Sequence, residues 1–143
     1  MKNLIYLFIL TLGIMSCSSD NETTIDNTDL IGEWNWTSTG GGINGDIHET
    51  PSTTGKTYKI NLNSNYTYSL FENEIEISSG TYELTMKESI YSGTTERFIT
   101  YSDNFQQPQN LVINGIVRTY EINNLSISDN NHDGIGSEFE KVE

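Results

Sequence analysis

Four oxygen-bearing residues near the C-terminus have the spacing of a calcium-binding loop. They are Asp129, Asn131, Asp133 and Glu140, and Gly134 follows the third of them. Oxygen ligands at the first, third, fifth and twelfth positions, with glycine at the sixth, are typical of an EF-hand loop. Hairpin turns select the same Asn, Asp and Gly residues, and the flanking segments read as strands. Two interpretations therefore stay open: a plain turn, which we favour, and a calcium site.

Other residues that could support catalysis or bind a metal do not form a recognisable pattern. The two histidines, His48 and His132, are far apart in the sequence, and neither lies near the single cysteine, Cys17, with metal-binding spacing. Alternating glutamates over residues 72–76 could in principle pair as acid and base, but they fall at a turn and on an outward strand face. We therefore predict that the protein is not an enzyme and has no resident metal or cofactor.

The charge of the chain narrows its possible partners. Among 143 residues there are 20 acidic and 7 basic side chains, which gives a formal net charge of −13. A surface that follows a phosphate backbone needs clustered positive charge, so we predict no nucleic-acid partner. The same sign disfavours close contact with an anionic membrane surface.

The N-terminus has the features of an exported protein. Lys2 precedes an apolar run over residues 4–12, and a small residue, Ser16, stands before Cys17. This layout is typical of a secretory signal, and the run is too short for a permanent membrane span. The Ile-Met-Ser sequence at 14–16, followed by the cysteine, resembles the lipobox of bacterial lipoproteins.

The lipobox resemblance implies a membrane-anchored protein. Residues 1–16 would be a lipoprotein signal peptide, and Cys17 would become the lipidated N-terminus. Residues 17–29 are polar and lack apolar periodicity, which predicts a flexible tether. The membrane is then a partner through the lipid. The expected location is the outer membrane of the cell envelope, with the domain in the periplasm or on the cell surface. A soluble secreted protein and a membrane-anchor helix are the alternatives.

From residue 30 onward, short segments alternate apolar and polar residues between Asn, Gly and Ser, which predicts strands joined by turns. A change of phase in the fourth segment predicts a β-bulge near Ser79 and Gly80, with two separate strands joined by a loop at Gly80 as the alternative. A second interruption is expected at Asn114 and Gly115. Sequential strands of this number can close into a barrel. The predicted fold is all-β, a single antiparallel eight-stranded up-and-down barrel over residues 30–143. The expected strands are 32–38, 56–63, 66–71, 75–86, 97–101, 111–122, 125–128 and 135–142.

A Gly-x-Trp motif opens the first of these strands. With Gly32 and Trp34 in these places, the strand resembles the lipocalin pattern, and the layout over residues 30–142 is similar to bacterial lipocalin-like lipoproteins. The resemblance implies a calycin barrel whose closed end is plugged by Trp34, with a basic residue of the last strand packed across it. Only Lys141 could take this place, where lipocalins usually have arginine.

Bulky residues at alternate positions are expected to face the barrel interior. Ile75, Ile77 and Met86 are among them. A glycine-rich loop over residues 40–51 would border the opening. An eight-stranded barrel is only just wide enough to be filled by its own side chains. Two functions therefore stay open: binding of a small apolar or amphipathic ligand, and a filled barrel that acts as an envelope structural or protein-interaction module. The expected ligand-binding residues are Tyr58, Ile60, Tyr66, Tyr68, Tyr82 and Leu84.

Overall fold

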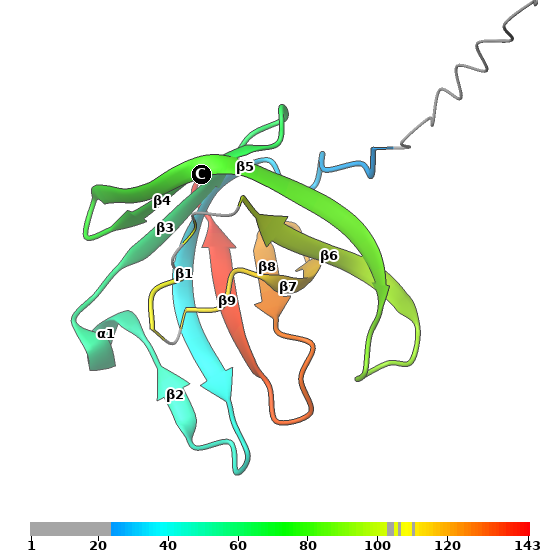
Figure 1. Cartoon of the computed structure of the whole chain (residues 1–143). Coiled ribbons are helices and arrows are strands. Elements are labelled where there is room, and N and C mark those ends of the chain that lie inside the picture. The colour runs from blue at the N-terminus through cyan, green and yellow to red at the C-terminus, as the bar shows by residue number, and fades with distance from the viewer. Residues whose placement is uncertain (1–23, 103–104, 106, 110) are drawn as a thin grey trace, which may run out of the picture.

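The computed structural model describes residues 24–102, 105, 107–109 and 111–143, which form a closed barrel (Figure 1). The elements are β1 (Gly32–Gly41), β2 (Ile47–Glu49), α1 (Pro51–Thr54), β3 (Tyr58–Leu62), β4 (Thr67–Glu72), β5 (Ile75–Glu88), β6 (Thr95–Tyr101), β7 (Gly115–Tyr120), β8 (Asn124–Ser128) and β9 (Ile135–Lys141). Strands β1 and β3 to β9 pair antiparallel in sequence order, and β1 pairs with β9 to close the sheet. Strand β2 is added to the edge of β1. The predicted all-β, eight-stranded up-and-down barrel is confirmed.

Strand β1 has a forked edge. Its residues 34–41 pair with β9, but on the other side residues 32–35 pair with β3 and residues 39–41 pair with β2. Relative to β9, Thr37 is an additional residue in β1, and this bulge turns both Trp36 and Thr39 into the barrel. We call the place where the edge of β1 passes from β3 to β2 the fork.

The two ends of the barrel differ. Residues 25–31 cross the end at which β1 begins and β9 finishes, and we call this the closed end. The opposite end, where β1 reaches Gly41 and β3 begins at Tyr58, is the open end. Figure 1 shows the blue N-terminal segment and the C-terminus together at the closed end.

The N-terminal segment is part of the folded domain. Asn27 is 4% exposed and donates a hydrogen bond of 2.6 Å from Nδ2 to the Tyr82 hydroxyl. The Tyr66 hydroxyl in turn donates to the Ile25 carbonyl at 2.8 Å. The flexible tether predicted over residues 17–29 therefore does not include residues 25–29, because these hydrogen bonds fix them to the barrel. Residues 17–23, like the signal peptide at 1–16 and Cys17, lie outside the described residues.

The bulge predicted in β5 is present but lies earlier than expected. Leu70 pairs with Ser78 and Phe71 pairs with Glu76, so Ile77 is the additional residue. A bulge reverses the phase of a strand, and its position therefore decides which residues face inward.

The inward orientation predicted for Ile75, Ile77 and Met86 is wrong. They are 70%, 44% and 51% exposed, respectively. Ile77 is the bulged residue, and Ile75 pairs with Glu72 at the rim of the open end, where the interior stops. Met86 pairs with Arg97 near the closed end. The alternation that places large residues inside holds only for the middle of β5.

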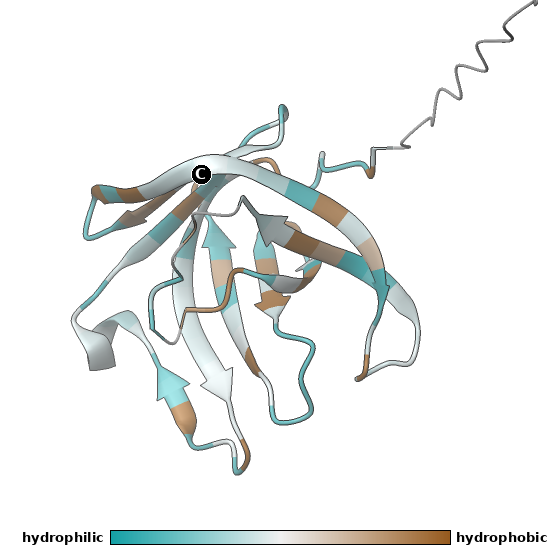
Figure 2. Cartoon of the chain, in the orientation of Figure 1, coloured by the Kyte–Doolittle hydropathy of each residue, from teal (hydrophilic) through white to brown (hydrophobic). Residues whose placement is uncertain are grey.

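The strand predicted over residues 111–122 is shorter in the structure. Strand β7 begins at Gly115, and residues 111–113 are buried in the core without pairing to a neighbouring strand. Figure 2 shows this aliphatic segment as a brown stretch that crosses the barrel. A short aliphatic run reads the same whether it pairs in a sheet or is buried as a coil. Gly115 has φ +152°, and a Cβ there would lie 2.0 Å from the Ser128 carbonyl oxygen, so glycine is required where β7 begins.

The loop predicted over residues 40–51 contains ordered structure. Strand β2 lies within it, and α1 follows directly. Thr50 caps α1 through a capping box with Thr53, and Pro51 occupies the first turn, where its missing N–H is no loss. In the described part of the chain, no helix has the length and apolar character needed to cross a membrane.

Candidate functional site at the open end of the barrel

Most of the six residues predicted to bind a ligand are packed into the core. Ile60, Tyr68 and Leu84 are 0%, 2% and 8% exposed and belong to one buried cluster. The Tyr68 hydroxyl shares a hydrogen bond of 2.8 Å with Ser78 Oγ. The part of the barrel interior around Ile60, Tyr68 and Leu84 is therefore filled by side chains that contact one another.

Two further tyrosines of this set hold the N-terminal segment. Tyr66 has φ +59° and lies in the turn before β4 rather than in the strand predicted there, and its hydroxyl binds the segment as described above. The Tyr82 hydroxyl accepts from Asn27 and donates to the Asn63 carbonyl at 3.1 Å. Burial raises the pKa of Tyr82 above its ordinary value. Of the six, Tyr58 alone faces the pocket at the open end described below.

A cluster of aromatic rings lies beside Tyr68. The ring centre of Tyr101 is 4.5 Å from that of Tyr68, in an edge-to-face arrangement, and 5.3 Å from that of Phe105. Tyr101 is partly buried as a residue, yet its hydroxyl oxygen is buried and has no hydrogen-bond partner among the described residues. Burial raises the pKa of Tyr101 well above its ordinary value.

A buried chain of hydrogen bonds fastens residues 111–113 to the barrel wall. The backbone N–H of Val112 donates to Ser137 Oγ at 2.8 Å. Ser137 Oγ shares a hydrogen bond of 2.6 Å with Thr39 Oγ1, which also accepts from Trp36 Nε1 at 2.9 Å. Because these polar groups are buried and partnered, the segment is held in one position. We call residues 111–113 the plug.

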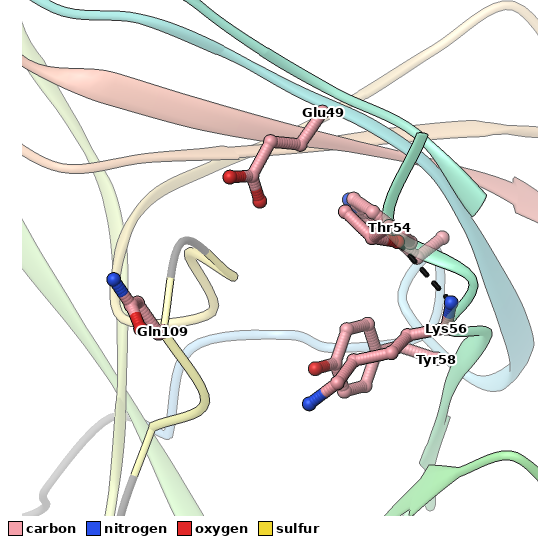
Figure 3. A pocket seen from close by; sticks show the side chains of 6 residues that line it. Glu49, Thr54, Lys56, Tyr58 and Gln109 are labelled. Atoms are coloured by element: carbon pink, nitrogen blue, oxygen red, sulfur yellow. Dashed lines mark hydrogen bonds between the residues drawn. The ribbon is translucent and has the colours of Figure 1, made fainter. Parts of the chain in front are cut away.

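The plug leaves a pocket beside the fork in β1 (Figure 3). The pocket has a volume of about 290 Å³. Its aromatic wall is formed by Trp36 and Tyr58, whose ring centres are 5.4 Å apart in an edge-to-face arrangement. Figure 3 shows Gln109 on one side of the pocket and Thr54, Lys56 and Tyr58 on the other, with Glu49 at the top of the view. The lining residues are Trp36, Glu49, Thr54, Lys56, Tyr58 and Gln109.

The charges around the pocket sum to a negative value. Lys56 Nζ lies 3.0 Å from Glu72 Oε1, and this hydrogen bond raises the pKa of Lys56. Burial, followed by the nearby Glu72 carboxylate, raises the pKa of Tyr58 above its ordinary value. With Glu49 as a second carboxylate, the site has two negative charges and one positive charge.

At the closed end, the structure brings together the three residues that the lipocalin resemblance singles out. Trp34 is 1% exposed and donates from Nε1 to the Leu30 carbonyl at 2.8 Å. Lys141 Nζ lies 5.1 Å from the centre of the Trp34 ring. The Lys141 stem runs against Gly32, where an added Cβ would be 2.8 Å from Lys141 Cε.

An ion pair completes the closed end. Arg97 donates from Nη1 and Nη2 to the two oxygens of Asp29 at 2.6 and 2.5 Å. The Thr119 hydroxyl also donates to Asp29 Oδ2, at 2.6 Å. The hydrogen bonds from Arg97 are the largest cause that lowers the pKa of Asp29 from 3.8 to about 2. The ion pair joins the N-terminal segment to β6, and the Thr119 hydrogen bond joins it to β7.

The segment with the spacing of a calcium loop is a turn between β8 and β9, in line with the favoured interpretation. Asp129 Oδ1 accepts from the Ile135 N–H at 3.1 Å, and the Asn131 carbonyl accepts from the Gly134 N–H at 3.0 Å. Glu140, the expected twelfth ligand, lies five residues beyond Ile135, about 16 Å further along β9. It cannot share an ion with the turn. Among the described residues, no group of three or more His, Cys, Asp or Glu side chains could hold a metal.

Several pocket residues had no signal in the sequence. Glu49 and Gln109 are separated by 60 positions, and only the folding of the connection before β7 brings them to one site. The position of Thr54 was predictable in part, because Thr50 followed by Pro51 is a helix-start signal. Glu49 also has a contact within the protein.

The chain matches no family model, no curated protein and no solved structure. The class of protein is therefore defined by the fold alone. Its closed antiparallel barrel of eight strands is consistent with a calycin-like fold.

Proposed function

We propose that this is a lipid-anchored protein of the cell envelope that binds a small amphipathic ligand in the pocket at the open end. The observation that carries the proposal is the pocket itself. Three stretches of the chain, at residue 36, residues 49–58 and residue 109, bring an aromatic wall and several polar groups to one hollow. Mixed apolar and polar lining of this kind is typical of small-molecule sites.

The size and charge of the pocket narrow the ligand. A volume of about 290 Å³ suits a small molecule rather than a long acyl chain. The ammonium of Lys56 is already paired with Glu72, and Glu49 adds a further negative charge. An anionic ligand would meet net repulsion, whereas a neutral or cationic ligand would not. The proposed ligand is therefore neutral or cationic, with one flat apolar face against Trp36 and Tyr58.

Lipid anchoring is supported by the sequence at the N-terminus. The signal-like residues 1–16 and the lipobox resemblance at Cys17 imply an acylated N-terminus at the outer membrane, facing the periplasm or the cell surface. The Cys17→Ser variant should be released from membranes on fractionation, because it lacks the acylated thiol. A variant that stays with the membrane to the same extent as wild type contradicts the anchor.

A second function is favoured by a specific observation. The core tyrosines contact one another, and the plug fills the interior beside β9. The barrel interior is therefore mostly filled by side chains, as in a structural scaffold. A scaffold of this kind could act as a structural or protein-interaction module of the envelope. No enzymatic activity is proposed in either case.

Two fluorescent probes with the same ring system test the site. N-phenyl-1-naphthylamine is uncharged, and 8-anilino-1-naphthalenesulfonate is an anion. We expect saturable binding of the uncharged probe and binding weaker by at least about tenfold for the anion, which the pocket carboxylates repel. Equal affinity for the two probes would show that the pocket carboxylates do not select against anions. If neither probe binds, the result favours the second function, a structural or protein-interaction module.

A pair of variants locates the binding site. In Thr54→Phe the new ring enters the pocket, and binding of the uncharged probe should weaken by at least about tenfold. Ser52→Phe places the same ring on the exposed side of α1 and should leave binding unchanged. If the two variants bind the probe equally well, the pocket is not the site. Native mass spectrometry of protein from its own cells would then identify a retained ligand.

A further inference from the structure

The closed end carries an exposed isoleucine at the tip of a turn. Ile122 is 91% exposed between β7 and β8. The C-terminus lies beside this turn, because the Lys141 N–H donates to the Asn123 carbonyl at 2.9 Å. Val142 follows and is 38% exposed. Two exposed apolar side chains therefore lie at the closed end, on adjoining parts of the chain.

The fold itself does not call for an isoleucine in this place. Glu121 supplies the left-handed backbone of the turn, with φ +52°. Turns favour Asn, Asp, Gly and Ser for reasons of local hydrogen bonding, and the turn over residues 63–65 follows this rule with Asn-Ser-Asn. Singly exposed apolar residues are common on protein surfaces, so the case for Ile122 depends on where it lies relative to the membrane anchor.

The N-terminal chain leaves the folded domain at this same end. Thr24 is seven residues from Cys17, so a fully extended chain between them spans at most about 25 Å. Strand β1, which runs from the closed end to the open end, has 10 residues and is about 33 Å long. An anchor at Cys17 therefore keeps the closed end near the bilayer, whereas the open end would reach it only with the tether stretched along the barrel wall.

We propose that the closed end docks on a zwitterionic lipid surface, with Ile122 inserted and the open-end pocket facing away from the membrane. This inference rests on the proposed lipid anchor at Cys17. Zwitterionic lipid is the occupant that suits the charge of this end. Glu121 and Glu140 border the same surface hollow as Ile122, Glu143 follows Val142 in the sequence, and anionic lipid would repel these carboxylates.

A single inserted isoleucine suffices because the domain is tethered. Burial of one aliphatic side chain binds a free protein to a membrane only weakly. A short tether makes the contact intramolecular, with an effective concentration in the millimolar range. The contact of Ile122 with the lipid then sets the orientation of the domain, while the acylated Cys17 attaches it to the membrane.

The test uses the full-length lipidated protein in phosphatidylcholine vesicles. Ile122→Cys and Ile43→Cys each provide one thiol for a nitrobenzoxadiazole label, because an acylated Cys17 does not react. Ile43 is the matched control: it is also an isoleucine, is 79% exposed, and lies in the loop beyond β1 at the open end. Brominated phosphatidylcholine should quench the label at position 122 at least about threefold more than the label at position 43.

The outcomes separate docking from anchoring. Intact mass is measured first, and a protein without acyl chains overturns the anchor and the docking together. If the protein is acylated but the label at position 43 is quenched as strongly as that at 122, or neither is quenched, docking by the closed end is wrong while the anchor stands. Quenching confined to position 122 supports the proposal.

Discussion

The two ends of this barrel are closed by different means. At the closed end, the N-terminal segment lies across the strands and is fixed by charged and neutral hydrogen bonds, with Trp34 almost fully buried beneath it. At the open end, the plug covers the interior through one buried chain of neutral hydrogen bonds, and a pocket of about 290 Å³ remains beside it. The closed end is thus fully packed and hydrogen-bonded, whereas the open end combines packing with an accessible pocket.

Replacing the two tryptophans should show this difference most strongly. Trp34→Ala leaves a closed cavity and should lower the free energy of unfolding by about 3–5 kcal/mol. Trp36→Ala should cost less, because Trp36 already borders the pocket and the lost volume opens to solvent. Urea denaturation of both variants measures the two costs. A larger loss for Trp36→Ala than for Trp34→Ala would contradict the proposed contrast between the ends.

Removing one hydroxyl should loosen the plug. Ser137→Ala leaves the Val112 N–H without its acceptor and takes a partner from Thr39, so the free energy of unfolding should fall by about 1–3 kcal/mol. Ser126→Ala is the control: it removes a serine hydroxyl on the outer face of β8, which donates to Glu138, and should cost about 0.5 kcal/mol or less. Thermal melts compare the two, and equal shifts would mean that the buried chain does not hold the plug.

The ion pair at the closed end should give a smaller effect that depends on pH. Because folding lowers the pKa of Asp29 from 3.8 to about 2, its stabilisation is present above pH 4 and is lost as pH falls towards 2. Asp29 is 38% exposed, so solvent screening limits the effect to about 1 kcal/mol or less. In Asp29→Asn, the fall in melting temperature between pH 4 and pH 2 should be shallower.

The carboxyl of Glu96 also contributes to the pH dependence of stability, in wild type and in Asp29→Asn alike. The hydrogen bond from Arg118 lowers the pKa of Glu96 from 4.5 to about 2, on the outer wall of the barrel. The acid dependence that remains in Asp29→Asn should therefore include a contribution from Glu96. An unchanged pH profile in Asp29→Asn would mean that the pair does not stabilise the closed end.

The barrel was predictable because period-two alternation is a local signal. Tyr58, Ile60 and Leu62 face inward on β3 as the pattern indicates, and the resemblance drawn from Gly32 and Trp34 correctly indicated a barrel. Alternation does not locate a bulge, since one additional residue can be inserted at any of several neighbouring positions. This is why the phase of β5 was misjudged at Ile77.

The candidate site was predicted less well because contacts distant in the sequence create it. Tyr58 was expected to bind a ligand, and it does face the pocket, but Gln109 reaches the same pocket only because the plug is buried rather than paired. The Asp29–Arg97 pair joins residues 68 positions apart and has no local signal. The tether prediction is wrong for residues 25–29 for the same reason, because their hydrogen bonds join them to Tyr66 and Tyr82.

The fork in β1 separates the strands that close the barrel from the segment that supplies residues to the pocket. The barrel closes through β9 and β3, whereas β2 and α1 leave the fork and return to it as an appendage that supplies Glu49 and Thr54 to the pocket. Lengthening such a loop costs little, about 0.6 kcal/mol for each doubling of its length. Residues 42–57 are therefore the segment in which evolution or a protein engineer could exchange one ligand preference for another while leaving the scaffold intact.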